Sequence, residues 1–212
     1  MSDSAPSPSG SSAPVSADAA QASAPGELRI ARVLHSEEVE RARAFFRMFV
    51  VIAVATGAGV SALPGPPWLR DLMLGLLVVG GLLCLYALRT LRDESRYTTR
   101  YATILGVCAA VVATSVIHYI GPFSAATMAL ALGIYFFAGS QSRSTARVCT
   151  GVAMLLHLVS TASLAAGLVP DVGLFPIAGT ARATLWFQVV MSQILLAVTF
   201  YLARWNRRST EA

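Results

Sequence analysis

Two histidines lie inside long apolar stretches of the chain, each with hydroxyl side chains one helical turn away. His118 has a threonine and a serine just before it, and His157 has Ser160 and Thr161 just after it. An imidazole changes its charge near neutral pH, so a histidine held among hydroxyl groups in an apolar setting could sense protons or bind a polar ligand. The sharper interpretation is therefore a ligand-binding or proton-sensing pocket built on His157 or His118. The alternative interpretation is structural: these side chains only form hydrogen bonds between helices, each of which stabilises the bundle by about 0.6 kcal/mol on average.

A third polar group occurs later in the chain and consists of Gln188, Ser192 and Gln193. At a helical rise of about 1.5 Å per residue, His157, Ser192 and Gln193 should lie near the middle of their apolar stretches, whereas His118 and Gln188 should lie nearer one end. The two histidines should then differ in depth by roughly 10–15 Å. Because the ligands of one metal ion lie about 2 Å from it, we expect no shared metal site.

The sequence lacks the motifs of the common catalytic centres. We find no nucleophile elbow, phosphate-binding glycine loop, HExxH motif or pair of catalytic carboxylates, and no Asp, Glu or Lys lies in the interior of an apolar stretch. Cys84, Cys108 and Cys149 have no CxxC or Cys/His spacing, so we expect them to pack as small apolar residues. The expectation is a chain without catalytic residues or a cofactor, and not an enzyme as given.

The composition predicts that the polar residues are positioned by membrane-spanning helices. The chain is 55% hydrophobic and only 13% charged, with a mean hydropathy of +0.63, whereas soluble domains carry about 25% charged residues. Six apolar stretches have lengths near the roughly 20 residues that cross a bilayer as a helix. They are residues 45–63, 69–88, 101–120, 123–139, 148–169 and 183–203. The predicted fold is an all-α, polytopic bundle of six transmembrane helices, in contact with the lipid bilayer.

The sixteen basic residues are all arginines, and their positions predict the topology. The loop between the second and third stretches holds four of them: Arg89, Arg92, Arg96 and Arg100. If every stretch spans, all arginines except Arg70 and Arg182 lie on one side, which the positive-inside rule assigns to the cytoplasm. We therefore expect an inner-membrane protein with both termini in the cytoplasm, whose net charge of +5 reflects topology rather than nucleic-acid binding. Alternatively, the four loop arginines bind anionic lipid headgroups, at about 1 kcal/mol each.

The segments that flank the apolar stretches differ in character. Residues 1–26 are rich in Ser, Ala and Pro, which predicts a disordered tail because such a segment buries too little apolar surface. Residues 27–44 predict a juxtamembrane helix, either lying on the membrane surface or surrounded by water, in which Glu40 and Arg43 form an i,i+3 pair. Residues 204–212 form a short cytoplasmic tail in this scheme.

Three segments resemble a known group of proteins. They are "GPFSAATMALALGIYFFAGSQSR" (121–143), "LVPDVGLF" (168–175) and "LARWNRRST" (202–210), and the basic loop after the second stretch fits the same pattern. The chain is similar to the six-helix membrane module that precedes the catalytic domain in bacterial receptor-type serine/threonine protein kinases and class III nucleotide cyclases. The resemblance implies a membrane-embedded sensory or anchoring module.

The chain departs from that group in lacking the catalytic half. The sequence has no kinase glycine-rich loop, HRD or DFG motif, and it ends shortly after Arg208. The expectation is a detached module, a truncated product, or a piece split from a separately encoded kinase or cyclase domain that would be its partner; a homodimer is a further expectation. The alternative function is a small multi-pass transporter or channel, which the six stretches and the polar residues at mid-depth would also fit.

Overall fold

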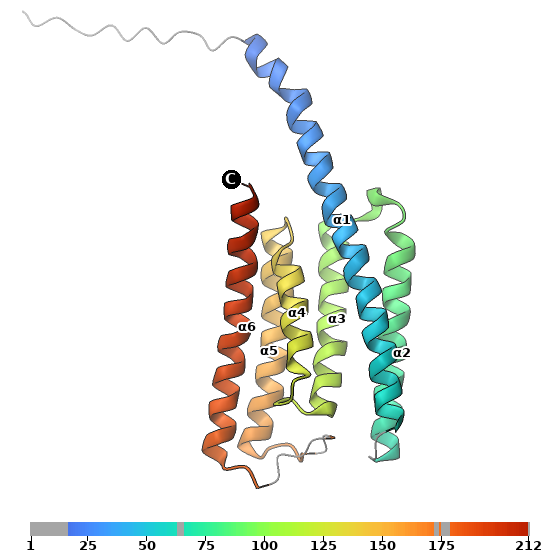
Figure 1. Ribbon diagram of the computed structural model, residues 1–212, viewed down its shortest axis with the longest axis vertical. Helices are drawn as coiled ribbons and strands as arrows, with labels where there is room; N and C mark the ends of the chain where they lie inside the picture. The colour runs from blue at the N-terminus through green and yellow to red at the C-terminus, as the bar shows by residue number, and fades with distance from the viewer. Residues whose placement is uncertain (1–16, 63–65, 172–173, 175–178, 212) are drawn as a thin grey trace, which may run out of the picture. The chain divides into compact units, whose positions relative to one another are not determined.

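A computed structural model of the chain describes residues 17–62, 66–171, 174 and 179–211, with side chains described between residues 32 and 209. Every regular element in this part of the chain is helical, which confirms the all-α prediction (Figure 1). The elements are α1 (Ala17–Ala62), α2 (Pro67–Thr90), the short 3-10 helix η1 (Glu94–Arg96), α3 (Thr99–Ile120), α4 (Thr127–Ala138), α5 (Arg143–Ala166) and α6 (Arg182–Glu211). The first sixteen residues of the expected tail lie outside the described residues, as does most of the segment 172–178.

The chain divides into two units, residues 1–37 and 38–212. In the first unit the described helix begins at Ala17, well before the expected boundary at residue 27, and the hydroxyl of Ser36 donates to the carbonyl of Val33. The second unit contains the rest of α1 and all the other helices. The sequence predicts an ion pair between Glu40 and Arg43. In the described residues the Arg43 guanidinium pairs instead with the Glu94 carboxylate, at 3.6 Å.

Five described helices, α1, α2, α3, α5 and α6, contain segments long and apolar enough to cross a membrane. Their outward faces carry large apolar side chains: for example, Val51 and Val54 on α1 are 68% and 70% exposed, and Leu82 on α2 is 61% exposed. Soluble proteins rarely expose continuous apolar surfaces of this kind. The exposed surface of the bundle therefore fits a hydrocarbon environment and defines the class as a helical, multi-pass membrane protein.

The fourth expected span, residues 123–139, corresponds to a much shorter helix. The twelve residues of α4 rise about 18 Å, whereas the hydrocarbon core is about 30 Å thick. A turn precedes it, in which Gly121 adopts a φ of 137° and the hydroxyl of Thr127 donates to the carbonyl of Pro122 at 2.9 Å. Turn-type hydrogen bonds from Ser124 to Gly121 and from Thr127 to Ser124 occupy the intervening residues, and the α-helix begins at Thr127.

Successive helices alternate in direction in the second unit, so α2, α4 and α6 end where α3 and α5 begin (Figure 1). We call this the arginine-rich end, because Arg70 and Arg182 lie at the opposite end. Local sequence signals fix several helix boundaries there: the hydroxyls of Thr98 and Ser142 accept hydrogen bonds from backbone amides in the first turns of α3 and α5. Such N-caps satisfy amide groups that the helix itself leaves unpaired.

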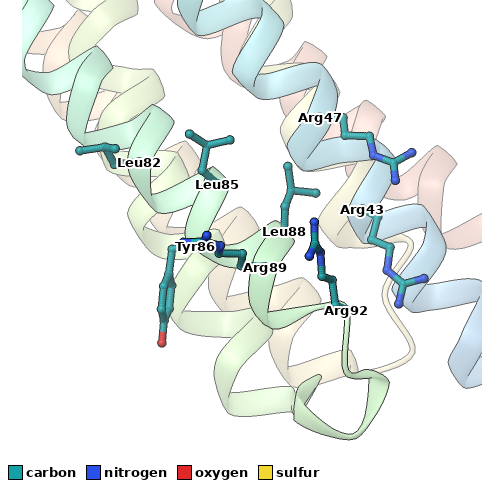
Figure 2. A pocket seen from close by; sticks show the side chains of 8 residues that line it. All are labelled: Arg43, Arg47, Leu82, Leu85, Tyr86, Leu88, Arg89 and Arg92. Carbon is teal, nitrogen blue, oxygen red and sulfur yellow. The ribbon is translucent and has the colours of Figure 1, made fainter.

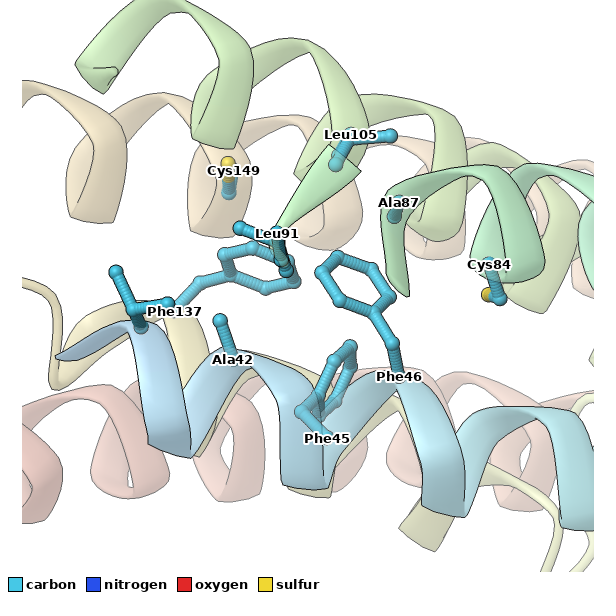
Figure 3. Close-up of a cluster of buried hydrophobic side chains, with 10 residues drawn as sticks. Ala42, Phe45, Phe46, Cys84, Ala87, Leu91, Leu105, Phe137 and Cys149 are labelled. Carbon is cyan, nitrogen blue, oxygen red and sulfur yellow. The ribbon is translucent and has the colours of Figure 1, made fainter. Parts of the chain in front are cut away.

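An aromatic cluster forms the core near the arginine-rich end (Figure 3). Phe45 of α1 stacks on Phe136 of α4 with ring centroids 4.1 Å apart, and Phe46 and Phe137 meet Phe45 edge-on. Cys84 and Cys149 are free thiols buried in the same cluster, which agrees with the expected packing role. This core holds α1 against α2, α3, α4 and α5 and so positions the polar groups described next.

Candidate functional site

His157 lies on α5 and is completely buried. Within the described part of the chain neither of its ring nitrogens has a hydrogen-bond partner. The neighbouring hydroxyl of Thr161 donates instead to the backbone carbonyl of His157, at 2.7 Å. The imidazole is therefore a buried polar group that the surrounding helices leave unsatisfied, which is unusual in folded proteins.

His118 lies on α3, where its Nδ1 atom is 2.5 Å from the hydroxyl oxygen of Ser160 on α5. The sequence placed Ser160 beside His157, one turn along α5, but the structure directs its hydroxyl to the other histidine. The two helices that this bond joins also approach closely at another point, where Gly106 on α3 leaves room for the sulfur of Cys149 on α5. The His118–Ser160 pair thus fits the interpretation as an interhelical hydrogen bond.

The three polar residues on α6 have different surroundings. The hydroxyl of Ser192 donates to the carbonyl of Val189 on its own helix at 2.9 Å, and Gln188 is half-buried. The side-chain nitrogen of Gln193 is buried and has no partner among the described residues. The structure therefore pairs His118 with Ser160 and leaves His157 and Gln193 as two separate unsatisfied groups.

The four arginines of the α2–α3 loop also divide into two groups. Arg89 and Arg92 line a groove between α1 and α2 together with Arg43 and Arg47 of α1 (Figure 2). Arg96 and Arg100 do not line it; the Nε atom of Arg96 lies 3.2 Å from a carboxylate oxygen of Asp93, and Arg100 is exposed. The loop is therefore not a uniform basic patch.

Three arginines that were not singled out in the sequence meet at the carboxyl end of α4. Arg41 of α1 and Arg207 of α6 both donate to the carbonyl oxygen of Gly139, the former at 2.7 Å and the latter at 2.5 Å. Arg204 of α6 donates to the carbonyls of Ala138 and Ser140, at 3.1 and 3.0 Å. The last carbonyls of a helix lack internal partners and carry the negative end of its dipole, so cations are favoured there.

A buried carboxylate completes this arrangement. Glu38 of α1 is only 8% exposed, and its Oε1 atom accepts hydrogen bonds from the hydroxyl of Ser140 at 2.7 Å and from the amide of Gln141 at 3.1 Å. We refer to Glu38, Arg41, Arg204 and Arg207 together as the α4 end cap. Burial, with the Glu38 carboxylate nearby, raises the pKa of the Tyr97 hydroxyl beside this cap, so the phenol remains neutral.

The carboxyl end of α2 is closed in a similar way. Arg43 donates from Nε and Nη2 to the carbonyl oxygen of Leu91, at 3.0 and 2.6 Å, and also faces Glu94. In the sequence, Glu38, Arg41 and Arg43 resemble the exposed charges of an ordinary surface helix. The signal for Arg41 and Arg43 is that the carboxyl ends of two later apolar stretches favour cationic partners; no such signal marks Glu38.

No metal or catalytic centre is assigned here. Among the described residues no three His, Cys, Asp or Glu side chains come together in a way that could hold an ion. Comparisons with protein-family models, curated protein sequences and solved structures gave no significant match. The site therefore has to be interpreted from its own geometry.

Proposed function

We propose that this protein is a non-enzymatic membrane module of a bacterial signalling system, in which the bundle senses a stimulus or anchors a cytoplasmic partner. The observation that carries the proposal is the double contact at Gly139, whose carbonyl oxygen binds Arg41 of α1 and Arg207 of α6. These two helices lead from the bundle toward the two ends of the chain. A signalling module needs such a mechanical connection between its membrane core and the segments that leave it.

The charge-assisted bonds of the α4 end cap would give that connection two states. With the bonds formed, the tail of α6 is tied to α4 and α1; with them broken, the tail is released. A stimulus that shifts α4 relative to α6 would change the direction in which the chain leaves the membrane. The resemblance stated from the sequence implies a linker to a kinase or cyclase domain after the last helix, so our proposal takes such a domain as the partner and a homodimer as the working assembly.

The proposed topology is an inner-membrane protein with both termini in the cytoplasm. Its support is the concentration of arginines at one end of the bundle, as the positive-inside rule requires. Reporter fusions after Ser95 should be active only inside the cell, and fusions after Gly121 only outside. A Ser95 fusion that is active outside would overturn this topology and with it the cytoplasmic partner.

The function itself is tested by deletion and complementation in the source cells. Loss of the chain should change the phosphorylation of cytoplasmic proteins or the level of a cyclic nucleotide, and the wild-type gene should restore it. A variant with Arg204 and Arg207 replaced by glutamine should insert normally but fail to restore the output. Unchanged signalling after deletion would count against the proposal.

A transporter or channel is the second candidate, and one observation favours it: the unsatisfied polar groups of His157 and Gln193 inside the bundle. Groups of this kind could bind a polar solute on its way through the membrane. Vesicles containing the purified chain should then show flux that the substitution His157→Leu abolishes. Flux that is equal in empty and protein-containing vesicles would remove this candidate.

A further inference from the structure

The groove between α1 and α2 at the arginine-rich end has a volume of about 850 Å³. Its lining combines four cations with an apolar wall (Figure 2): Arg43, Arg47, Arg89, Arg92, Leu82, Leu85, Tyr86 and Leu88. Two of the arginines, Arg43 and Arg47, come from α1, and the other two, Arg89 and Arg92, come from the end of α2 and the turn that follows it. Leu88, which lines the groove, also packs against the aromatic core.

The four guanidinium groups differ in the hydrogen bonds and ion pairs that they make within the chain. Arg43 binds the carbonyl of Leu91 and faces Glu94. No hydrogen bond or ion pair to another described residue is found for Arg47, Arg89 or Arg92, and all three side chains are exposed. Neighbouring cations repel one another, so an anion between them would be favoured. Because a guanidinium presents its donors in a planar fork, phosphate oxygens are its best-matched partners.

The apolar side of the groove indicates that the bound anion also carries a hydrocarbon part. Leu82 and Leu85 are 61% and 51% exposed, and the wall continues along α2 for about 10 Å from Arg89 toward the middle of the bilayer. Tyr86, 60% exposed, stands between the charged and the apolar part, at the level where aromatic side chains meet lipid headgroups. A ligand that fills this groove needs a phosphate at one end and hydrocarbon at the other.

We propose that the groove is a binding site for an anionic phospholipid. Its phosphate is held by Arg47, Arg89 and Arg92, and its acyl chains lie along Leu82 and Leu85. Of the four loop arginines, Arg89 and Arg92 bind the lipid in this proposal. Arg96 and Arg100 do not, because they lie outside the groove. The site is independent of any signalling partner.

A second basic groove, of about 310 Å³, lies between α5 and α6. Two of its four arginines are already engaged with backbone carbonyls, Arg147 with Arg143 and Arg204 with the end of α4. It therefore offers fewer free cations in a smaller volume. The α1–α2 groove is the stronger lipid site of the two.

The experiment uses the purified full chain in a neutral detergent. Dioleoyl phosphatidylglycerol or dioleoyl phosphatidylcholine is added, and bound lipid is counted by native mass spectrometry. Wild-type protein should prefer phosphatidylglycerol. The variant R89Q/R92Q should lose about 30-fold in affinity for it, and the matched control R96Q/R100Q, which removes the same charge from the same loop, should lose less than about threefold.

Three results would overturn the proposal. Equal losses in both variants would mean that the lipid follows the general surface charge, and equal binding of both lipids by the wild type would remove the role of the anion. Displacement of phosphatidylglycerol by soluble glycerol 3-phosphate at similar concentration would mean that the arginines recognise a free phosphate compound. If R89Q/R92Q does not retain its helical circular dichroism, the single substitution Arg47→Gln takes its place, with an expected loss of about fivefold.

Discussion

The carboxylate of Glu38 accepts a hydrogen bond of 2.7 Å from the hydroxyl of Ser140, more than a hundred residues further along the chain. The same oxygen binds the backbone amide of Gln141, so one side chain of α1 fixes the junction between α4 and α5. A buried carboxylate is costly unless it is hydrogen-bonded, and here the Ser140 hydroxyl and the Gln141 amide provide the bonds.

Replacing Glu38 with alanine should destabilise the protein by about 1–2 kcal/mol, because it removes the acceptor of the buried Ser140 hydroxyl and of the Gln141 amide. Denaturant unfolding in detergent micelles measures the change, and hydrogen exchange at Gln141 should accelerate. Glu40→Ala, an exposed carboxylate on the same helix, serves as the control and should have little effect. Similar losses in both variants would contradict the role assigned to Glu38.

Gly106→Ala should destabilise the bundle by about 1–3 kcal/mol through overpacking. A β-carbon at this position would collide with the sulfur of Cys149 and approach Phe137 to 2.8 Å. The matched variant Gly133→Ala meets no atom within 4 Å and should be neutral or stabilising by up to about 1 kcal/mol, since alanine favours the helix. Thermal unfolding of the two proteins should thus show shifts of opposite sign, and equal shifts would argue against close packing of α3 and α5.

Substitutions at the two histidine sites should have different effects on stability, because His118 has a hydrogen-bond partner and the buried His157 has none among the described residues. Ser160→Ala removes the hydrogen bond to His118 and should cost about 0.6 kcal/mol, with an upper limit near 1.7 kcal/mol. His157→Leu removes an imidazole with no partner among the described residues, so stability should stay within about 1 kcal/mol or rise. A large loss for His157→Leu, measured by the same unfolding experiment, would show that this ring makes a bond absent from the structure.

The turn after α2 should loosen in acid. The Ser95 hydroxyl and amide donate to Asp93, and these bonds, with a smaller contribution from Arg96, hold the pKa of Asp93 below its ordinary 3.8. Because the folded pKa is lowered, the stabilisation is complete above the ordinary value and is lost as the pH falls through the lowered one. Exchange of the Ser95 amide should therefore lose protection at low pH.

Asp93→Asn should remove this pH dependence, because the amide does not titrate. The control substitution Asp71→Asn, at the other end of α2, should leave the pH dependence of exchange at Ser95 unchanged. Protection of Ser95 that does not change with pH in the wild type would refute the assignment.

The positions of most helices could be predicted from the sequence, because a membrane-spanning helix needs about 20 mostly apolar residues and tends to have arginines at its cytoplasmic end. The expected spans 69–88 and 101–120 agree with α2 and α3 within a few residues. The length of α4 was overestimated because the apolar residues before Thr127 continue the hydropathy while Gly121 and Pro122 interrupt the backbone. A hydropathy profile does not reveal this turn, because the residues that form it are mostly apolar or small.

The partners of the polar side chains could not be predicted in the same way. Ser160 and Thr161 are neighbours in the sequence, yet one bonds to another helix and the other to its own backbone. Which of these occurs depends on which side of α5 faces α3, and the two helices have to be packed before that is known. Glu38 was missed for a related reason, since its partners at 140 and 141 are adjacent to it only after α1 and α4 have packed.

The shortness of α4 has a consequence for how the protein is made. A helix of twelve mostly apolar residues is too short to reach both headgroup layers, so it should partition poorly into a bilayer on its own. We therefore expect α4 to insert together with α3 or α5, as a helical hairpin. On that expectation, a substitution that weakens the insertion of α5 should also impair the insertion of α4.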